Sequence, residues 1–165
     1  MSRFGHTVMD SPLGKLLIAE EEGYISKILF INDGDTLPAD QPTPLTQIAV
    51  RQLNEYFTGT RLSFDFPIRQ LGTDFQQRVW NELLRISTGK TLSYLDLARK
   101  LGDEKSIRAA ASANGKNNLA IVVPCHRVIG ADGKLVGYAG GLWRKKWLLE
   151  HEARMAGKSV QTSLF

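Results

Sequence analysis

The first third of the chain shows short apolar runs separated by turn residues, a pattern typical of an antiparallel sheet. The expected strands cover residues 4–9, 15–19 and 24–31, each bounded on one side by Gly or Asp. Residues 45–57 then carry apolar side chains three to four positions apart, which predicts a helix ended by Gly59. Residues 62–67 are expected to add one more strand.

Helical spacing dominates the rest of the chain. The expected helices cover residues 73–86, 94–101, 106–114 and 144–156, and a buried strand is expected over 119–123. A short polar turn separates the second and third of these helices, which is the outline of a helix-turn-helix. Many helix pairs share this outline, so by itself it indicates little about DNA binding.

These elements predict an α/β (α+β) protein with two domains. An amino-terminal domain over 1–70 holds the antiparallel sheet and one helix, and a mostly helical domain with the helix-turn-helix covers 71–157. Residues 158–165 are expected to form a flexible tail. A chain of 165 residues, of which 42% are hydrophobic, is long enough to bury a core of this kind.

Charge is distributed unevenly along the chain. Residues 1–88 contain 8 Lys and Arg against 11 Asp and Glu, whereas residues 89–165 contain 13 against 6. The basic second half is compatible with a polyanionic partner such as nucleic acid. It is equally compatible with a basic surface that only solvent covers.

The chain contains one cysteine, which excludes an internal disulfide and a cysteine-rich zinc site. The sequence shows no leader pattern and no apolar run long enough to cross a bilayer. We therefore expect a cytoplasmic monomer with no membrane partner.

The sole cysteine, Cys125, is the leading candidate for chemistry. Pro124 precedes it at the end of an apolar run, and His126 and Arg127 follow. Neighbouring cations favour thiolate over thiol, and a cysteine with a nearby histidine fits a nucleophile and its base. The competing interpretation is a buried cysteine that acts only as a small apolar side chain.

A general base usually needs an orienting acid, and the last predicted helix supplies one. Glu152 shares the apolar stripe of that helix with Leu148, whereas Glu150 lies on the other side. A carboxylate that faces a core needs a partner, and His126 is the candidate. The alternative is a surface glutamate of which only the stem is buried.

The sequence Pro-Cys-His-Arg over 124–127, followed by Val-Ile-Gly, resembles the active-site motif of the O6-alkylguanine-DNA alkyltransferases. Further segments resemble the same family in the same order: Ser93-Tyr94, Arg108-Ala109, 113–117, 137–141 and 146–152. The resemblance is strong over 73–157. The first 70 residues match the more variable amino-terminal α/β domain of the family more loosely.

The resemblance implies DNA repair by direct and irreversible transfer of the alkyl group of O6-alkylguanine to Cys125, so that each molecule is consumed in one turnover. It leaves open whether O4-alkylthymine is also a substrate. It implies that His126 takes the thiol proton through a water, that Glu152 orients His126, and that Asn117 braces this network. Tyr94 would donate a proton as guanine leaves. No cofactor and no metal are implied.

The resemblance also implies a pocket for the extruded base. The backbone carbonyls of Cys125 and Val128 would hold the exocyclic amine of guanine, and the amide of Ala139 would face O6. Tyr138 and Gly140 would form the pocket wall.

The same resemblance implies binding of double-stranded DNA through the minor groove. Arg108 would fill the gap that the extruded base leaves in the stack. The small side chains of Ala109 and Ala110 would let the helix approach the backbone closely, and Ser93 and Asn114 would contact DNA. The alternative is that alanine is present because it favours helix.

Two positions depart from the family. Asn118 stands where proline usually follows the motif asparagine, and 111–112 replaces a pair that often contains glycine. The multi-cysteine metal domain of the adaptive-response regulators is absent. The ligands of the zinc site found near the amino terminus of some relatives are absent too.

Three other functions remain as alternatives. A non-enzymatic module that binds alkylated DNA would lack the cysteine, and a thiol hydrolase would turn over many times. A helix-turn-helix regulator would read base edges, for which an alanine-rich helix with one arginine is poorly equipped.

The end of the chain resembles the short peptide by which many bacterial replication and repair proteins bind the sliding clamp. Gln161 would lead this peptide and Leu164 and Phe165 would close it, although Thr162 stands where leucine is usual. Short motifs of this kind also arise by chance. We therefore keep sliding-clamp binding through this peptide as a hypothesis, and we expect the protein to associate with the nucleoid when it is bound to DNA.

Overall fold

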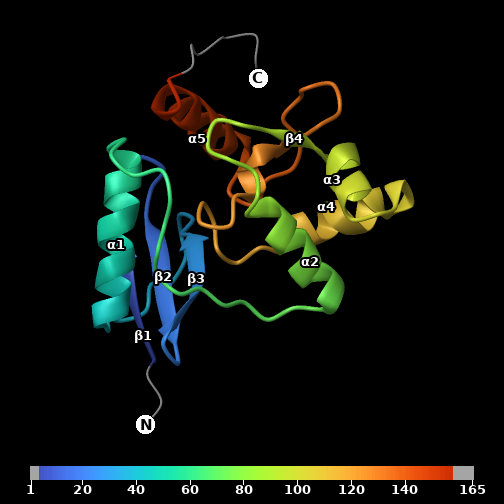
Figure 1. Ribbon diagram of the computed structural model, residues 1–165. Helices are drawn as coiled ribbons and strands as arrows, with labels where there is room; N and C mark the ends of the chain where they lie inside the picture. The colour runs from blue at the N-terminus through green and yellow to red at the C-terminus, as the bar shows by residue number, and fades with distance from the viewer. Residues whose placement is uncertain (1–3, 158–165) are drawn as a thin grey trace. The chain divides into compact units, whose positions relative to one another are not determined.

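The computed structural model describes residues 4–157. The chain divides into two units (Figure 1), Met1–Leu71 with Asn118–Val122, and Gly72–Asn117 with Val123–Phe165. The short segment 118–122 thus belongs with the first unit, although it lies inside the range predicted for the second domain. The predicted clamp-binding residues Gln161, Leu164 and Phe165 lie outside the described residues.

The first unit is built on a three-stranded antiparallel sheet. Its strands are β1 (Phe4–Met9), β2 (Leu16–Glu21) and β3 (Tyr24–Phe30), in that order across the sheet. Helix α1 (Pro44–Phe57) packs on the sheet, and the Thr43 hydroxyl caps its first turn. The predicted strands and helix are therefore confirmed, with ends that shift by one or two residues.

Alternation along the strands fixes which face of the sheet is buried. Ile18 lies between Thr7 on β1 and Ile28 on β3, and Ile18 and Ile28 are fully buried. Leu53 and Tyr56 of α1 are also fully buried. This core forms because the period of two on the strands and the helical period on α1 both direct apolar side chains to one layer.

The predicted strand over 119–123 is wrong. Only Leu119 forms a bridge, with Ile28, and a left-handed turn at Ile121, with a φ of 72°, ends the extended run. Asn118 and Ala120 form backbone hydrogen bonds with Ile28 of 2.8 and 3.1 Å. The apolar composition of 119–123 thus indicated that the segment is buried, but it did not indicate its conformation.

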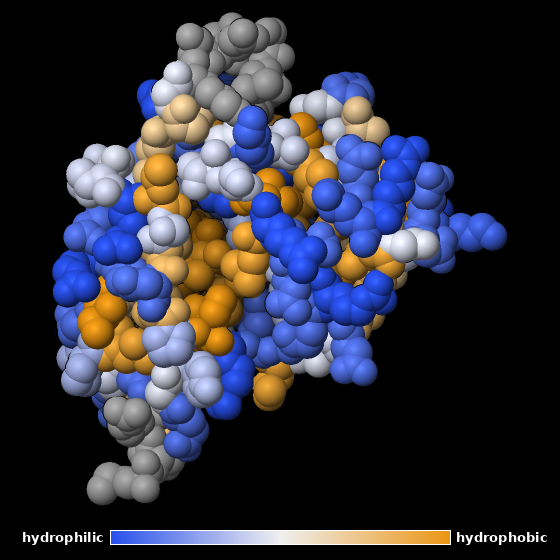
Figure 2. All heavy atoms as spheres, in the orientation of Figure 1, coloured by the Kyte–Doolittle hydropathy of each residue, from blue (hydrophilic) through white to orange (hydrophobic). Residues whose placement is uncertain are grey.

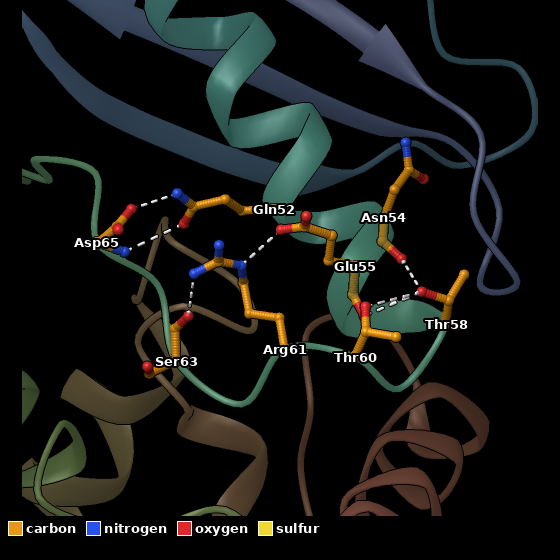
Figure 3. Close-up of polar contacts among 8 residues, drawn as sticks. All are labelled: Gln52, Asn54, Glu55, Thr58, Thr60, Arg61, Ser63 and Asp65. Atoms are coloured by element: carbon orange, nitrogen blue, oxygen red, sulfur yellow. Dashed lines mark hydrogen bonds and ion pairs between the residues drawn. The ribbon is translucent and has the colours of Figure 1, made fainter.

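The predicted strand over 62–67 is also wrong, because side chains of α1 form hydrogen bonds with the polar groups of this segment. The Gln52 side chain accepts from the Asp65 amide at 3.1 Å and donates to the Asp65 carboxylate (Figure 3). Arg61 forms an ion pair of 2.8 Å with Glu55. The segment is held by these contacts and by a buried Phe66, and it meets β3 only at its end, where Ile25 donates to the Pro67 carbonyl at 2.9 Å.

The second unit contains the predicted helix-turn-helix. Helix α3 (Tyr94–Lys100) is followed by the short 3₁₀ helix η1 (Glu104–Ser106) and by α4 (Ile107–Gly115). Helix α2 (Asp74–Leu83) packs on both, and the Trp80 indole donates to the Ala113 carbonyl at 3.0 Å. Helix α2 ends at Leu83 and not at Ile86, because the chain tightens into a turn in which Ile86 donates to the Leu83 carbonyl at 3.0 Å.

A two-residue parallel pairing connects the start of α3 to the segment that follows the cysteine. Strand β4 (Leu92–Ser93) pairs with β5 (Val128–Ile129), and the 3₁₀ helix η2 (Cys125–Arg127) directly precedes β5. Helix α5 (Leu142–Met155) packs on η2. The parts of the chain that carry the predicted chemistry are thereby gathered inside the second unit.

The hydrogen bonds between Gln52 and Asp65 give a first prediction. Asp65→Ala leaves the amide of the buried Gln52 without its acceptor, so the free energy of unfolding should fall by about 1–3 kcal/mol. Urea unfolding measures this change. Ser63→Ala is the control, because the Ser63 carbonyl and not its hydroxyl accepts from Arg61. A loss in the control as large as in Asp65→Ala would contradict the assignment.

Candidate active site

Cys125 lies at the point where a buried segment bends into η2. Pro124 precedes it, and the Cys125 amide donates to the Val123 carbonyl at 2.8 Å. The side chain is buried, with 8% of the residue exposed. Burial raises the pKa of the Cys125 thiol, while a hydrogen bond from the Asn117 side chain and the charge of Lys145 oppose the rise.

This electrostatic environment corrects the expectation that His126 and Arg127 favour the thiolate. The guanidinium of Arg127 donates instead to Glu152, at 2.7 and 3.0 Å, and to the Ile86 carbonyl at 2.5 Å. The cation that lowers the Cys125 pKa is Lys145, to which no pattern in the sequence pointed. Proximity along the chain was a poor guide, because consecutive residues of a 3₁₀ helix point in different directions.

The prediction that Glu152 pairs with His126 agrees with the structure. The His126 Nε2 and the Glu152 Oε2 lie 2.8 Å apart, and both side chains are buried. Since a carboxylate only accepts, Nε2 carries the proton and donates to Glu152. The His126 Nδ1 has no hydrogen-bond partner among residues 4–157 and is left as the acceptor of the ring.

Glu152 therefore accepts hydrogen bonds from two side chains, those of His126 and Arg127, in buried surroundings. Burial alone would raise the Glu152 pKa, but the charges and hydrogen bonds of His126 and Arg127 outweigh it and hold that pKa well below its usual range. Glu150 points elsewhere and lies 4.0 Å from Lys146 on the partly exposed side of α5. Helical periodicity therefore predicted correctly that Glu152 faces inward and Glu150 does not.

Two asparagines fix the backbone around the cysteine. The Asn117 amide donates to the Val123 carbonyl at 2.8 Å and interacts with the Cys125 thiol. The Asn114 amide donates to the Cys125 carbonyl at 3.3 Å. The placement of Asn117 fits its predicted bracing role.

Asn114 and Ala110, both predicted to contact DNA, are buried within the second unit. Only 4% of Asn114 is exposed, and its side chain points to the Cys125 carbonyl and to Tyr94. Ala110 is likewise fully buried, and its methyl group packs inside the unit. The run of small residues in the sequence did not show which of them face outward.

The outward face of α4 carries Arg108, Ala109 and Ser112, all exposed. Polar side chains gather over α3 and α4 in the view of Figure 2. Ser93 is the N-cap of α3, where its hydroxyl accepts from the Asp96 amide at 3.0 Å. Arg108 and Ala109 are therefore available for a ligand, and Ser93 is half-buried.

Tyr94 begins α3 and reaches the loop between β5 and α5, residues 130–141. Its hydroxyl donates to the Val136 carbonyl at 3.4 Å. Burial and the Cys125 charge raise the Tyr94 pKa, against a hydrogen bond from Asn114. Tyr94 is thus protonated at neutral pH and can donate a proton.

The predicted pocket-wall residues lie in the same β5–α5 loop or beside it. Val128 is buried in β5, Tyr138 is half-buried, Ala139 is exposed and Gly140 is buried. Burial raises the Tyr138 pKa well above its usual value, assisted by the charges of Cys125 and Glu152 and opposed by Arg144. The Cys125 carbonyl already accepts from the Val128 amide and from Asn114, which limits its capacity to hold another donor.

Between residues 4 and 157, no group of three or more His, Cys, Asp or Glu is placed to hold a metal ion. No helix in that range is long and apolar enough to cross a membrane.

Comparison with known proteins identifies the family. The family model for the 6-O-methylguanine DNA methyltransferase DNA binding domain matches residues 74–154, and that for the ribonuclease-like domain of the same proteins matches 5–70. This chain belongs to the O6-methylguanine-DNA methyltransferase family. The resemblance found in the sequence is therefore confirmed over both units.

Individual members of this methyltransferase family cover nearly the whole chain. The constitutive methylated-DNA–protein-cysteine methyltransferase of Bacillus subtilis is 42% identical over 93% of this chain and 97% of that protein. The Mycobacterium tuberculosis enzyme is 44% identical over 92% and 93%. The crystal structure of the M. tuberculosis O6-methylguanine methyltransferase matches with a TM-score of 0.82, 41% identity and 99% coverage of both chains. A structure of that protein in complex with DNA matches with a TM-score of 0.82, 43% identity and coverage of 91% and 93%.

The depressed pKa of Glu152 predicts how stability changes with pH. Its folded-state pKa lies below the unfolded value, so the stabilisation by its charge is present above about pH 4.5 and is lost as the pH falls through the folded value. Glu152→Gln should lower the free energy of unfolding by about 3–5 kcal/mol at pH 7, because Arg127 loses its counter-charge, and by less at pH 3.

Urea unfolding at the two pH values measures this difference. Glu150→Gln is the matched control on the same helix and should change the free energy by less than about 1 kcal/mol. Equal effects of the two substitutions, or an effect of Glu152→Gln that does not depend on pH, would show that the charge of Glu152 does not stabilise the fold.

Proposed function

We propose that this protein repairs O6-alkylguanine in double-stranded DNA by transferring the alkyl group irreversibly to Cys125. The observation that carries the proposal is that the only thiol begins η2 and directly precedes His126, which is paired with the buried Glu152, in a member of this family. Enzyme class and direct alkyl transfer follow from the family, whose members include methylated-DNA–protein-cysteine methyltransferases. The role of each residue is our proposal.

The reaction is a displacement at the alkyl carbon. His126 accepts the thiol proton on Nδ1 through a water, because Nε2 is engaged by Glu152. The thiolate of Cys125 then forms a bond to the alkyl carbon, the bond from that carbon to O6 breaks, and its electron pair goes to the base. Tyr94 gives a proton to the departing guanine. Exchange with solvent returns a proton from His126 to Tyr94, so the products are a neutral thioether and neutral guanine.

The thioether has no leaving group that a second nucleophile of the site could displace, so the protein is consumed. This separates the proposal from a thiol hydrolase, which regenerates its cysteine. It also separates it from a module that only binds alkylated DNA, since such a module needs no reactive thiol.

We further propose that DNA binds at the outward face of α4 through its minor groove, with the alkylated base extruded from the stack. Arg108 is exposed and supplies a long cationic side chain, and Ala109 and Ser112 beside it are small enough for close approach to a backbone. Arg108 fills the gap in the stack and offsets part of the cost of flipping.

The finer proposals on cellular context are supported by sequence alone. We propose that the protein is a cytoplasmic monomer that associates with the nucleoid when it is bound to DNA. We also propose that residues 161–165 contact the sliding clamp.

Stoichiometry tests the transfer. With excess duplex that contains O6-methylguanine, intact-protein mass spectrometry should show one methyl group added to each chain and no further reaction, because Cys125 is the only thiol. Cys125→Ser should bind the duplex and accept no methyl group. More than one repaired base per protein molecule would show turnover and exclude the proposed mechanism.

A comparison of two substrates tests Arg108. Arg108→Ala should slow repair of O6-methylguanine in duplex DNA about tenfold or more and leave the reaction with the free base O6-benzylguanine unchanged, because only the duplex requires flipping, at a few kcal/mol. Lys105→Ala, an exposed cation on η1, is the control and should affect both reactions little. Equal losses on both substrates for Arg108→Ala would assign the residue a structural role.

A further inference from the structure

Arg144 occupies an unusual position for a cation, because it lies in the first turn of α5. The helix begins at Leu142 after the N-cap Gly141, and this turn carries no acidic residue. The amino end of a helix favours negative charge and disfavours positive charge. Arg144 is nevertheless buried, with 8% of the residue exposed. A buried cation at this end of a helix is costly, so its contacts must account for it.

Two contacts hold the Arg144 side chain. One terminal nitrogen of its guanidinium donates to the Gly140 carbonyl at 2.8 Å, in a buried hydrogen bond. The guanidinium carbon lies 4.7 Å from the centre of the Trp143 ring, which is a cation–π contact. Arg144 therefore contacts the backbone of the β5–α5 loop and the neighbouring indole at the same time.

The peptide between Gly140 and Gly141 is bonded at both of its polar groups. Its carbonyl accepts from Arg144, and its N–H, which belongs to Gly141, donates to the Tyr138 carbonyl at 2.9 Å. Gly141 has a φ of 92°, in the left-handed region that glycine adopts without strain. Two successive glycines have no side chains to limit their backbone, so these two hydrogen bonds restrict the turn formed by residues 138–141.

Trp143 restricts the same turn from the surface. A Cβ atom at Gly141 would lie 3.3 Å from Cδ1 and 3.4 Å from Nε1 of the indole, so the ring packs directly against this glycine. Trp143 is 57% exposed. The indole thus contacts both Gly141 and the guanidinium of Arg144, while most of the residue remains in solvent.

The 138–141 turn contains the residues predicted to line the base pocket. Tyr94, the proposed proton donor, reaches the same loop, where its hydroxyl donates to the Val136 carbonyl at 3.4 Å. The amide of Ala139 is predicted to face O6, the atom that carries the alkyl group. Because Arg144 holds the carbonyl of the next residue, Gly140, the wall beside O6 has little freedom to move back. A wall that cannot move back penalises any alkyl group larger than the space in front of it.

We propose that Arg144 is a specificity-determining residue, which sets the size of the alkyl group that the protein accepts by holding the 138–141 turn in place. The proposal rests on the proposed function, since the turn has this effect only where it borders the alkylated base. No bond of Arg144 forms or breaks in the reaction, and its role requires no contact with the base. A fixed turn is preorganised for a small alkyl group, whereas a large group must displace the turn and break the hydrogen bond to Gly140.

Three variants separate the contacts of Arg144. Arg144→Met keeps a long apolar stem and loses the hydrogen bond to Gly140. Arg144→Lys keeps a charged donor and loses the planar guanidinium. Trp143→Ala keeps the hydrogen bond and removes the indole. Lys146→Met is the matched control, because it removes an exposed cation from the same helix.

Two measurements are made on each variant. Single-turnover rates on one duplex sequence that carries either O6-methylguanine or O6-benzylguanine give the ratio of benzyl to methyl transfer. Both duplexes require extrusion of a base from the same position, so most of the flipping cost cancels in this ratio. Amide hydrogen exchange at Gly141, whose N–H donates to Tyr138, measures the rigidity of the turn without any DNA.

Arg144→Met should raise the benzyl-to-methyl ratio about tenfold and speed exchange of the Gly141 amide about tenfold, which is the order of effect of one hydrogen bond from a charged donor. Trp143→Ala and Arg144→Lys should change both quantities in the same direction by a smaller factor, because each keeps part of the hold on the turn. Lys146→Met should match the original protein in both measurements.

An unchanged ratio in a folded Arg144→Met variant would overturn the proposal. Equal falls in both rates together with a lower melting temperature would overturn it too, since that is the result of a merely structural role. If Arg144→Met does not fold, Trp143→Ala decides, because an exposed indole can be removed without loss of the core, and an unchanged ratio there rejects the proposal.

Failure of the proposed function gives a different result. In that case the original protein transfers neither group, and the specificity role of Arg144 fails with it. Faster exchange of the Gly141 amide in Arg144→Met would still establish that Arg144 holds the turn. If the original protein transfers both groups and no variant changes the ratio, the proposed function stands and the role of Arg144 alone is rejected.

Discussion

The second unit is organised around the buried carboxylate of Glu152. A charge removed from water requires partners, and Glu152 takes them from η2, where His126 and Arg127 both donate to it. Arg127 also donates to the Ile86 carbonyl in the turn after α2 and to the Thr88 hydroxyl at 3.3 Å. One carboxylate thus ties α5, η2 and the turn after α2 together. It also fixes which nitrogen of His126 carries the proton, and the other nitrogen is the one that we propose as the acceptor of the thiol proton.

Reactivity at Cys125 works against a second constraint, which is burial. A buried thiol resists ionisation, so the site needs charge and hydrogen bonds that offset the desolvation. Lys145 provides the charge and Asn117 the hydrogen bond. Burial in turn lowers the pKa of the Lys145 amine. Tyr94 is held protonated by the same dry surroundings. Burial therefore opposes ionisation of the Cys125 thiol and keeps the Tyr94 hydroxyl protonated, as its proposed role as a proton donor requires.

The alanines of α4 have two different uses. Ala110 and Ala113 are buried against the unit, and the Trp80 indole donates to the backbone of Ala113. Ala109 lies on the outward face with Arg108 and Ser112. Small side chains on the inner face allow close helix packing, while those on the outer face leave the helix backbone accessible. A helix of this kind can approach a DNA backbone, and it offers few groups for reading base edges.

The sequence alone determined the order and type of most elements, because apolar periods of two and of three to four directly reflect which side chains must leave water. It also determined that Glu152 and not Glu150 faces inward, since helical geometry fixes relative direction along one element. The ordered motifs indicated the family, which the comparisons confirmed. Tertiary structure decided which residues meet across elements. It placed Asn114 and Ala110 inside, assigned Arg127 to Glu152, and directed Lys145 toward Cys125. It also turned 119–123 and 62–67 away from strand, because a left-handed turn at Ile121 ends the contact with β3 and the Gln52 side chain of α1 bonds Asp65. The local sequence pattern determines which face of its own helix or strand a side chain lies on. The residue that this side chain contacts depends on how separate elements pack.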